Sequence, residues 1–431
     1  MNLWSRRSFL AAPAALALEG GTPVRSEPLQ ARLFGPLYYD DSEWGLIGEV
    51  LRSRSPFRFR GFGSETPQKV TTFEHEFAAF MQTKYALAVN SGTTALQTAM
   101  AALGVGPGDE VIVPAWTWHS CFNAVVLAGA LPVCAEIDES FNLDPKQVEQ
   151  HITPATKVLM AVHLQGNPAD MDSLLEIAKR RNLKVLEDVS QSVGASYKGK
   201  PLGSMGDIAI ASLQVNKTIS AGEGGAVYTN DPTLFERAVR FHDVGGIRPP
   251  HQSWLGGAHL DPFIGTNYRM SELTGAVLVA QIRKLPRIVS DIRGVAGRVY
   301  AGIRDLPGIE FRKLPDPAGE LGSAVFAGFK DKERRDRFMA AMKAENVPVL
   351  PPGGSVILPV QSYAIAKRTA HPDWPSFNTA RGKAMRYGPD TCPQTIAVLN
   401  RFAGVSLDPK FSERDAADIV AAVRKVLPTV N

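Results

Sequence analysis

The chain has 431 residues, 44% of them hydrophobic and 21% charged, and its 47 Lys and Arg against 43 Asp and Glu give a formal net charge of +4. These proportions are typical of a globular protein with a large core, and they exclude a disordered chain, a collagen and a coiled coil. The sequence has no block of basic residues, so we do not expect the protein to bind nucleic acid. No apolar run reaches the roughly 18 residues of a membrane span, so we expect no stable membrane insertion.

The same counts argue against metal chemistry. The cysteines Cys121, Cys134 and Cys392 are too widely spaced for a zinc site or a disulfide framework. The eight histidines show no HExxH spacing, so a zinc hydrolase is not expected. We therefore predict no metal ligands.

The N-terminus has the order of a signal peptide. Arg6 and Arg7 precede an apolar stretch from Phe9 to Leu18, and Ala15-Leu16-Ala17 is a candidate cleavage site. A positive segment followed by about 7–15 apolar residues is typical of secretory signals. The tandem arginines resemble a twin-arginine export signal. We expect residues 1–17 to be such a signal and the protein to be exported to the periplasm, with a cytoplasmic protein as the alternative.

From about residue 70 to residue 229, strand-like and helix-like segments alternate. Helices are expected at 73–81, 93–103 and 171–181. Short apolar strands are expected at 110–114, 131–137, 157–162, 184–186, 208–213 and 226–229. Strands separated by helices predict an α/β fold with a mostly parallel sheet.

The pattern changes after about residue 285. A long helix from Leu273 continues past Pro286, a segment rich in Pro and Gly covers 306–354, and a final helix is expected at 413–426. We expect a large domain with an N-terminal arm at 18–288 and a smaller α+β domain at 289–431.

One polar motif lies between a strand and a helix, at Asn90-Ser91-Gly92-Thr93-Thr94. Gly92 allows a close approach of the backbone, and the start of the next helix offers free N–H groups and the positive end of the helix dipole. These features predict an anion-binding site. The alternative is an ordinary helix N-cap.

Two further motifs carry ionisable groups. Glu187-Asp188 ends an apolar strand, where a buried carboxylate requires a cationic partner such as a protonated pyridine nitrogen. A capping role for Asp188 on the next helix is the alternative. Lys217 follows another apolar strand and enters a Gly-rich loop, where partial burial can lower a lysine pKa and make the amine a nucleophile. Taken alone, an ordinary surface lysine is the alternative. An anion site, an acidic strand end and a loop lysine together indicate pyridoxal 5'-phosphate.

These motifs resemble the DegT/DnrJ/EryC1/StrS family of pyridoxal-phosphate-dependent sugar aminotransferases. The resemblance covers roughly residues 18–430 and is carried by GGTPVR at 20–25, SGTTAL at 91–96, PAWTW at 114–118, EDVSQ at 187–191, GEGGAVYT at 222–229 and GTNYRMSEL at 265–273. It implies a fold-type I aminotransferase that forms a homodimer with shared active sites.

The resemblance also implies the roles of individual residues. Lys217 is the lysine that binds the cofactor aldehyde, and Asp188 is the partner of the pyridine nitrogen. The other implied cofactor contacts are Gly92, Thr93 and Ser212 on the phosphate, Trp118 stacked on the ring, Gln191 near the phenolic oxygen, and Asn267 on the phosphate in the neighbouring subunit. Some members are dehydratases with His in place of the lysine, so Lys217 favours amination.

The sequence departs from the family pattern near the substrate. Val193 stands where many members have His, and Leu213 stands where Phe is common. His163 matches a strand end near the site, although a core histidine is an equal reading.

The resemblance predicts transfer of an amino group from glutamate or glutamine to a keto-sugar, and we expect this sugar to be linked to a nucleotide. An aminocyclitol or aminohydroxybenzoate type of synthase is the alternative within the family, and the GGTPVR start is typical of that subgroup. A non-catalytic, exported saccharide-binding protein is the alternative of another class.

Overall fold

The computed structural model describes residues 21–59 and 67–430, so the expected signal at 1–17 lies outside the described residues. Its centre is a seven-stranded sheet in the order β1-β10-β9-β6-β5-β2-β4. The strands are β1 (Tyr85–Val89), β10 (Gly225–Thr229), β9 (Ile208–Ser212), β6 (Lys184–Asp188), β5 (Thr156–Val162), β2 (Glu110–Pro114) and β4 (Leu131–Ala135). Only β10 runs antiparallel to its neighbours in this sheet. The prediction of a mostly parallel sheet is therefore confirmed.

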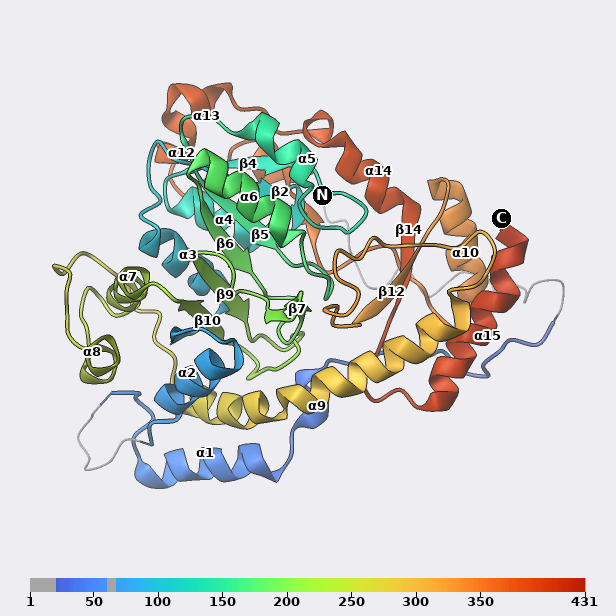
Figure 1. Ribbon diagram of the computed structural model, residues 1–431, viewed down its shortest axis with the longest axis horizontal. Coiled ribbons are helices and arrows are strands. Elements are labelled where there is room, and N and C mark those ends of the chain that lie inside the picture. The colour runs from blue at the N-terminus through green and yellow to red at the C-terminus, as the bar shows by residue number, and fades with distance from the viewer. Residues whose placement is uncertain (1–20, 60–66, 431) are drawn as a thin grey trace.

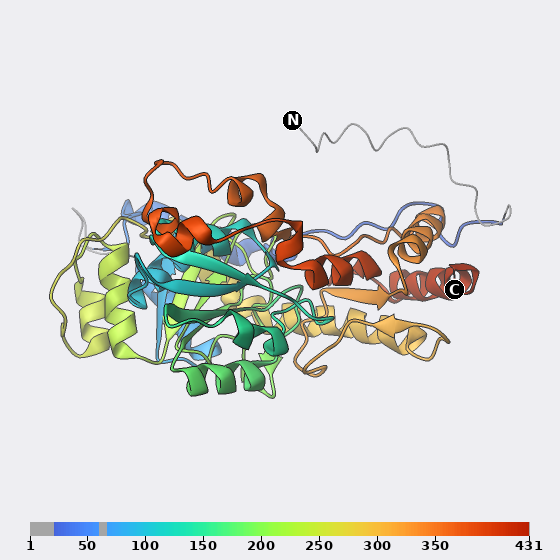
Figure 2. The ribbon, with the colours of Figure 1, turned by 90° about the horizontal axis from the view of Figure 1, so that it is seen from above.

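Helices cover both faces of this sheet (Figures 1 and 2). Each face carries its own hydrophobic core. Alternate side chains of a strand point to opposite faces, so Leu87 and Val89 enter one core while Ala86 and Ala88 enter the other. The first core includes α3 (Gly92–Ala102), α4 (His119–Leu127) and α7 (Pro232–His242). The second includes α2 (Lys69–Phe80), α6 (Met171–Arg181) and α9 (Glu272–Ile303).

The C-terminal part is built on a second, three-stranded antiparallel sheet. Its strands are β11 (Glu310–Phe311), β12 (Ala324–Gly328) and β14 (Phe402–Ser406). The helices here are α10 (Lys332–Ala344), α14 (Pro393–Arg401) and α15 (Glu413–Val430). Helix α9 runs from beneath the main sheet into this part (Figure 1). It therefore belongs to both halves of the molecule.

Two segments join the halves near the carboxyl ends of the main strands. The short strand β13 (Val356–Ile357) pairs with β3 (Trp116–Thr117), which follows β2. The arm at 21–34 packs on the C-terminal part, where Leu29 N–H donates to Asn346 O at 2.8 Å and Arg25 pairs with Asp415 and Asp418. Residues distant in sequence thereby surround one edge of the sheet.

The remaining elements are short or peripheral. They are α1 (Asp41–Ser53), α5 (Pro145–Val148), α8 (Pro249–Leu255), α11 (Ser362–Ile365), α12 (Pro375–Asn378), α13 (Ala380–Ala384), the hairpin of β7 (Ser196–Tyr197) and β8 (Lys200–Pro201), and the 3-10 turns at 35–38, 149–151, 358–360 and 389–391. Among the described residues, no helix has both the length and the apolar character needed to cross a membrane.

Most expected elements are confirmed within a few residues, and α6 and β2 have the expected bounds. The expected helix at 73–81 was placed too late, because it begins at Lys69. The strand expected at 131–137 ends earlier, at Ala135. The final helix continues beyond 426 to Val430. Sequence periodicity identifies the apolar face of a helix better than its ends.

Candidate active site

A cavity of about 660 Å³ opens where β6 and β9 end and α3 begins. Seven of the predicted site residues line it: Gly92, Thr93, Trp118, Asp188, Gln191, Ser212 and Lys217. Ligands in open α/β sheets bind beyond the carboxyl ends of the strands, and this cavity has that position. The tertiary structure therefore brings together residues that lie up to 125 positions apart in the sequence, as the motifs predict.

The N-terminus of α3 forms one end of the cavity. The Ser91 hydroxyl accepts from Thr94 N–H at 3.1 Å, so Ser91 is the N-cap of this helix. The first N–H groups of a helix have no partner within it, and they face an anion favourably. The Thr93 hydroxyl lies 2.7 Å from the Ser120 hydroxyl. The N-cap and the anion site are thus two properties of the same helix end.

Gly92 is required here by a close approach of two elements. A Cβ at this position would lie 2.6 Å from Ser212 Cβ and 2.9 Å from Ser212 Oγ. Such distances are far below ordinary contact, so a side chain at residue 92 would push α3 away from the end of β9. The missing side chain allows the Ser212 hydroxyl and the start of α3 to border one small volume.

Lys217 enters the cavity from the loop that follows β9. Its N–H donates to Gln214 O at 2.9 Å, and its carbonyl accepts from Gly35 N–H at 3.3 Å. Burial lowers the pKa of the amine below 10.5, while the charge of Asp188 acts in the opposite direction. The uncharged, nucleophilic form of this amine is therefore easier to reach by loss of a proton than it is in a lysine on the surface.

Asp188 is a buried carboxylate at the end of β6, with 4% of its surface exposed. Its Oδ1 accepts from Ser190 N–H at 2.9 Å, and its Oδ2 accepts from the Cys121 thiol at 3.3 Å. No Lys, Arg or His in the described part of the chain forms an ion pair with it. The hydrogen bond from Ser190 closes a turn and no helix begins there, so the alternative of a helix cap is wrong.

The neighbouring carboxylate, Glu187, is fully buried and satisfied inside the protein. It accepts from the backbone N–H groups of Gly203 and Met205 at 2.8 and 2.9 Å, and it lies 3.1 Å from His163 Nε2. His163 Nδ1 accepts from Ala169 N–H at 3.0 Å, so its proton is on Nε2. His163 is therefore a core histidine, and the reading that placed it at the site is not supported.

Gln191 and Trp118 complete the wall. The Gln191 side chain donates to Ser355 Oγ at 3.1 Å and to Gly354 O at 3.3 Å, and it accepts from Gln165 N–H at 3.1 Å. It thus connects the loop after β6 to the C-terminal part. The Trp118 indole, 52% exposed, borders the cavity just before α4 and has a free face for stacking.

Asn267 does not line the cavity of its own chain. It is exposed, forms an isolated bridge with Asp243, and lies in the segment between α8 and α9. The side-chain oxygen accepts from Arg269 N–H at 3.3 Å. A contact of Asn267 with a cofactor therefore requires a second copy of the chain, as the prediction states.

These groups fit pyridoxal phosphate. An anion site, a nucleophilic amine and a buried carboxylate that lacks a cation would contact the phosphate, the aldehyde and the ring nitrogen. Residues 61–352 match the DegT/DnrJ/EryC1/StrS aminotransferase family. The chain belongs to this family.

Individual members support the assignment over different lengths. The GDP-perosamine synthase of Caulobacter vibrioides is 43% identical over 229 residues, which span 53% of this chain and 60% of that enzyme. The GDP-perosamine synthase of Vibrio cholerae is 31% identical over 79% of this chain and 91% of its own length. The crystal structure of 3-amino-5-hydroxybenzoic acid synthase superposes with a TM-score of 0.73, 27% identity and coverage of 93% and 100%. The fold is thus that of the aminotransferases of this family.

The sequence analysis missed two side chains in the wall of the site. Thr117 and Cys121 lie on either side of Trp118 in the chain, and the Cys121 thiol donates to Asp188. Their only signal is that Thr117 belongs to the PAWTW motif and Cys121 follows it closely, and a motif does not show which way each side chain points. Within the described ranges no group of three or more His, Cys, Asp or Glu side chains could hold a metal ion.

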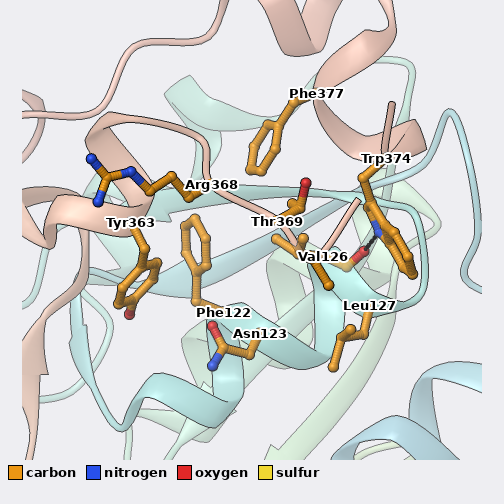
Figure 3. Close-up of a pocket in the computed structure, with 10 residues that line it drawn as sticks. Phe122, Asn123, Val126, Leu127, Tyr363, Arg368, Thr369, Trp374 and Phe377 are labelled. Carbon is orange, nitrogen blue, oxygen red and sulfur yellow. Dashed lines mark hydrogen bonds between the residues drawn. The ribbon is translucent and has the colours of Figure 1, made fainter. Parts of the chain in front are cut away.

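A second cavity, of about 270 Å³, lies beside α4 (Figure 3). Its walls include four aromatic side chains, those of Phe122, Tyr363, Trp374 and Phe377, and Trp374 Nε1–H donates to Val126 O. Arg368 is its only charged lining residue among those described. This cavity lacks the acid, base and nucleophile that an aminotransferase needs, so the cavity at β6 and β9 is the candidate site.

Proposed function

We propose that this protein is a pyridoxal-phosphate-dependent aminotransferase that moves an amino group from glutamate or glutamine to a nucleotide-linked keto-sugar. The observation that carries the proposal is the buried Asp188 carboxylate, which forms no ion pair within the described part of the chain and shares one cavity with the Lys217 amine. The similarity to GDP-perosamine synthases supports a nucleotide-linked sugar as acceptor.

When bound, pyridoxal phosphate supplies an aldehyde that reacts with amines and a ring that accepts electrons. Lys217 Nζ would hold the aldehyde carbon in the resting enzyme and, once released, take up and return the proton that is moved during amino transfer. Asp188 would keep a proton on the ring nitrogen by electrostatic stabilisation. These two residues are our catalytic assignments.

The remaining residues would bind and orient the cofactor. The hydroxyls of Thr93 and Ser212 and the N–H groups at Gly92 would bind the phosphate. The Trp118 indole would cover one ring face and exclude water from it. Gln191, whose amide is held by Gly354 and Ser355, would lie beside the phenolic oxygen and could donate to it in place of one of these partners.

We also propose that the protein is a homodimer in which Asn267 reaches the partner's phosphate site. Two exposed apolar side chains near Asn267 support an interface there, since Ile264 is 95% exposed and Val244 is 59% exposed.

We further propose that residues 18–288 and 289–431 are the large and small domains, connected by α9. The tandem arginines Arg6 and Arg7 support export by the twin-arginine route.

The experiment is a panel of acceptors with the purified protein. Nucleotide-linked keto-sugars, keto-cyclitols and the keto precursor type of aminohydroxybenzoate are each incubated with glutamate or glutamine, and the amine product is measured. We expect amination of a nucleotide-linked keto-sugar, no product with Lys217→Ala, and normal product with Lys200→Ala, which changes an exposed lysine in the β7–β8 hairpin.

Other outcomes would contradict parts of the proposal. Amination of a keto-cyclitol or a hydroxybenzoate precursor alone would replace the acceptor class, and the superposition on 3-amino-5-hydroxybenzoic acid synthase makes this the second candidate. Saccharide binding without a bound cofactor would indicate the non-catalytic protein. Product formation by Lys217→Ala would overturn the assignment of the nucleophile.

A further inference from the structure

A buried thiol in the wall of the proposed site contacts its carboxylate. Cys121, in the first turn of α4, has no exposed surface, and its Sγ lies 3.3 Å from Asp188 Oδ2. The hydroxyl of Thr117, also buried, lies 3.3 Å from the same sulfur. The three side chains therefore form a short chain of polar atoms in the wall of the cavity.

The direction of these hydrogen bonds follows from the chemistry of the end group. An ionised carboxylate only accepts, so the Cys121 S–H must donate to Asp188. Burial, and next the charge of Asp188, raise the pKa of the Cys121 thiol well above its usual value, so the thiol keeps its proton. The sulfur can then accept from the Thr117 hydroxyl. The order is Thr117 O–H to Cys121 S–H to Asp188.

This contact completes the support of the carboxylate. Ser190 N–H donates to Oδ1 and Cys121 S–H donates to Oδ2, so each oxygen is held by one donor and the carboxylate plane is fixed. The charge of Lys217, which lines the cavity, acts on both groups.

We infer that Cys121, supported by Thr117, is a positioning residue that holds the Asp188 carboxylate in the orientation that the ring nitrogen of the cofactor requires. The inference rests on the proposed function for its consequence in catalysis. The contact itself belongs to the protein, so it can be tested whether or not the protein transfers amino groups.

The other two cysteines provide matched controls. Cys134 and Cys392 are also buried, and the Cys392 sulfur lies 3.7 Å from Cys134 O with no carboxylate on either thiol. Cys134→Ala therefore removes a buried thiol of the same size from a β-strand without touching Asp188.

The first test is infrared spectroscopy of the full-length protein. In a Cys134→Ala/Cys392→Ala background, the S–H stretching band belongs to Cys121 alone, since the sequence has three cysteines. A thiol that donates to a carboxylate absorbs at lower frequency than one that donates to a neutral group. We expect this band to move to higher frequency when Asp188→Asn is added. An unchanged band would overturn the contact.

The second test measures pyridoxal phosphate affinity at a fixed pH. Lys217 on the loop after β9 and Tyr228 on β10, whose charges also interact with Asp188, stay the same in all variants, so a difference between variants reports the thiol. Cys121→Ala leaves the carboxylate with one of its two donors, Ser190 N–H. We therefore expect this variant to bind the cofactor about tenfold more weakly than wild type.

Two comparisons decide between positioning and mere packing. Cys121→Ser retains a donor, and we expect it to restore the wild-type cofactor affinity to within about threefold, while Cys134→Ala leaves the affinity unchanged. If Cys121→Ala lowers the unfolding temperature but leaves the cofactor affinity as in wild type, the thiol only fills space and the inference fails. Failure of wild type to bind the cofactor at any pH would instead overturn the proposed function and leave the infrared result standing.

Discussion

Substitution of Gly92 by alanine tests the anion site where two elements touch most closely. The added Cβ would lie 2.6 Å from Ser212 Cβ and 3.1 Å from Ser212 Cα, whereas carbon atoms pack at about 3.5–4.0 Å. The start of α3 and the end of β9 would have to separate by about 1 Å to accommodate it. Both elements carry proposed phosphate ligands, so the separation enlarges the site itself.

The magnitude follows from the cost of overpacking, which is typically about 1–3 kcal/mol. The phosphate needs Ser212 and the helix terminus close together, so we expect most of this cost to appear as lost cofactor affinity. Since about 1.4 kcal/mol is a factor of ten, pyridoxal phosphate should bind about 5- to 150-fold more weakly to Gly92→Ala.

The assay is a titration of the cofactor-free protein with pyridoxal phosphate, followed by absorbance, together with the unfolding temperature. Gly106→Ala is the matched control, because a Cβ at Gly106 meets no atom within 4 Å and its φ is not positive. We expect wild-type affinity for the control. If Gly92→Ala binds the cofactor as tightly as Gly106→Ala, the phosphate does not lie between α3 and Ser212, and the reasoning is refuted.

Three further predictions follow from other residues. Asp188→Asn should retain the cofactor but lose about 100-fold or more in rate, because an amide does not hold the pyridinium proton; a rate within twofold of wild type would place that partner elsewhere. Inactive Asn267→Ala mixed with inactive Lys217→Ala should recover about a quarter of wild-type activity through mixed dimers, and no recovery would exclude a shared site. Burial, and then the Arg58 charge, lower the pKa of His242 to about 3, so only the unfolded chain takes up this proton as the pH falls below 6.5. Wild type should therefore lose about 2 kcal/mol more stability than His242→Phe between pH 7 and pH 5 in denaturant unfolding, and equal losses would show that His242 is not buried in its neutral form.

The sequence by itself determined the elements and the order of the motifs. Strand alternation and helix periodicity are local properties of the chain, so β2 and α6 could be predicted with their bounds. The strand-end positions of Asp188 and Ser212 and the loop position of Lys217 then sufficed to predict one site, because parallel strands present their carboxyl ends at the same edge of a sheet.

Only the tertiary structure decided which side chains support that site. Cys121 and Asp188 are 67 positions apart, and their hydrogen bond depends on how α4 packs against the end of β6. His163 could not be assigned from sequence, because its contact with Glu187 depends on the pairing of β5 with β6, and its acceptance from Ala169 N–H depends on the turn that follows β5. The anchoring of Gln191 by the loop at 353–355 likewise required the small sheet to be placed against the large one. Packing between distant elements, which no local pattern encodes, separates a residue that performs chemistry from one that holds it in place.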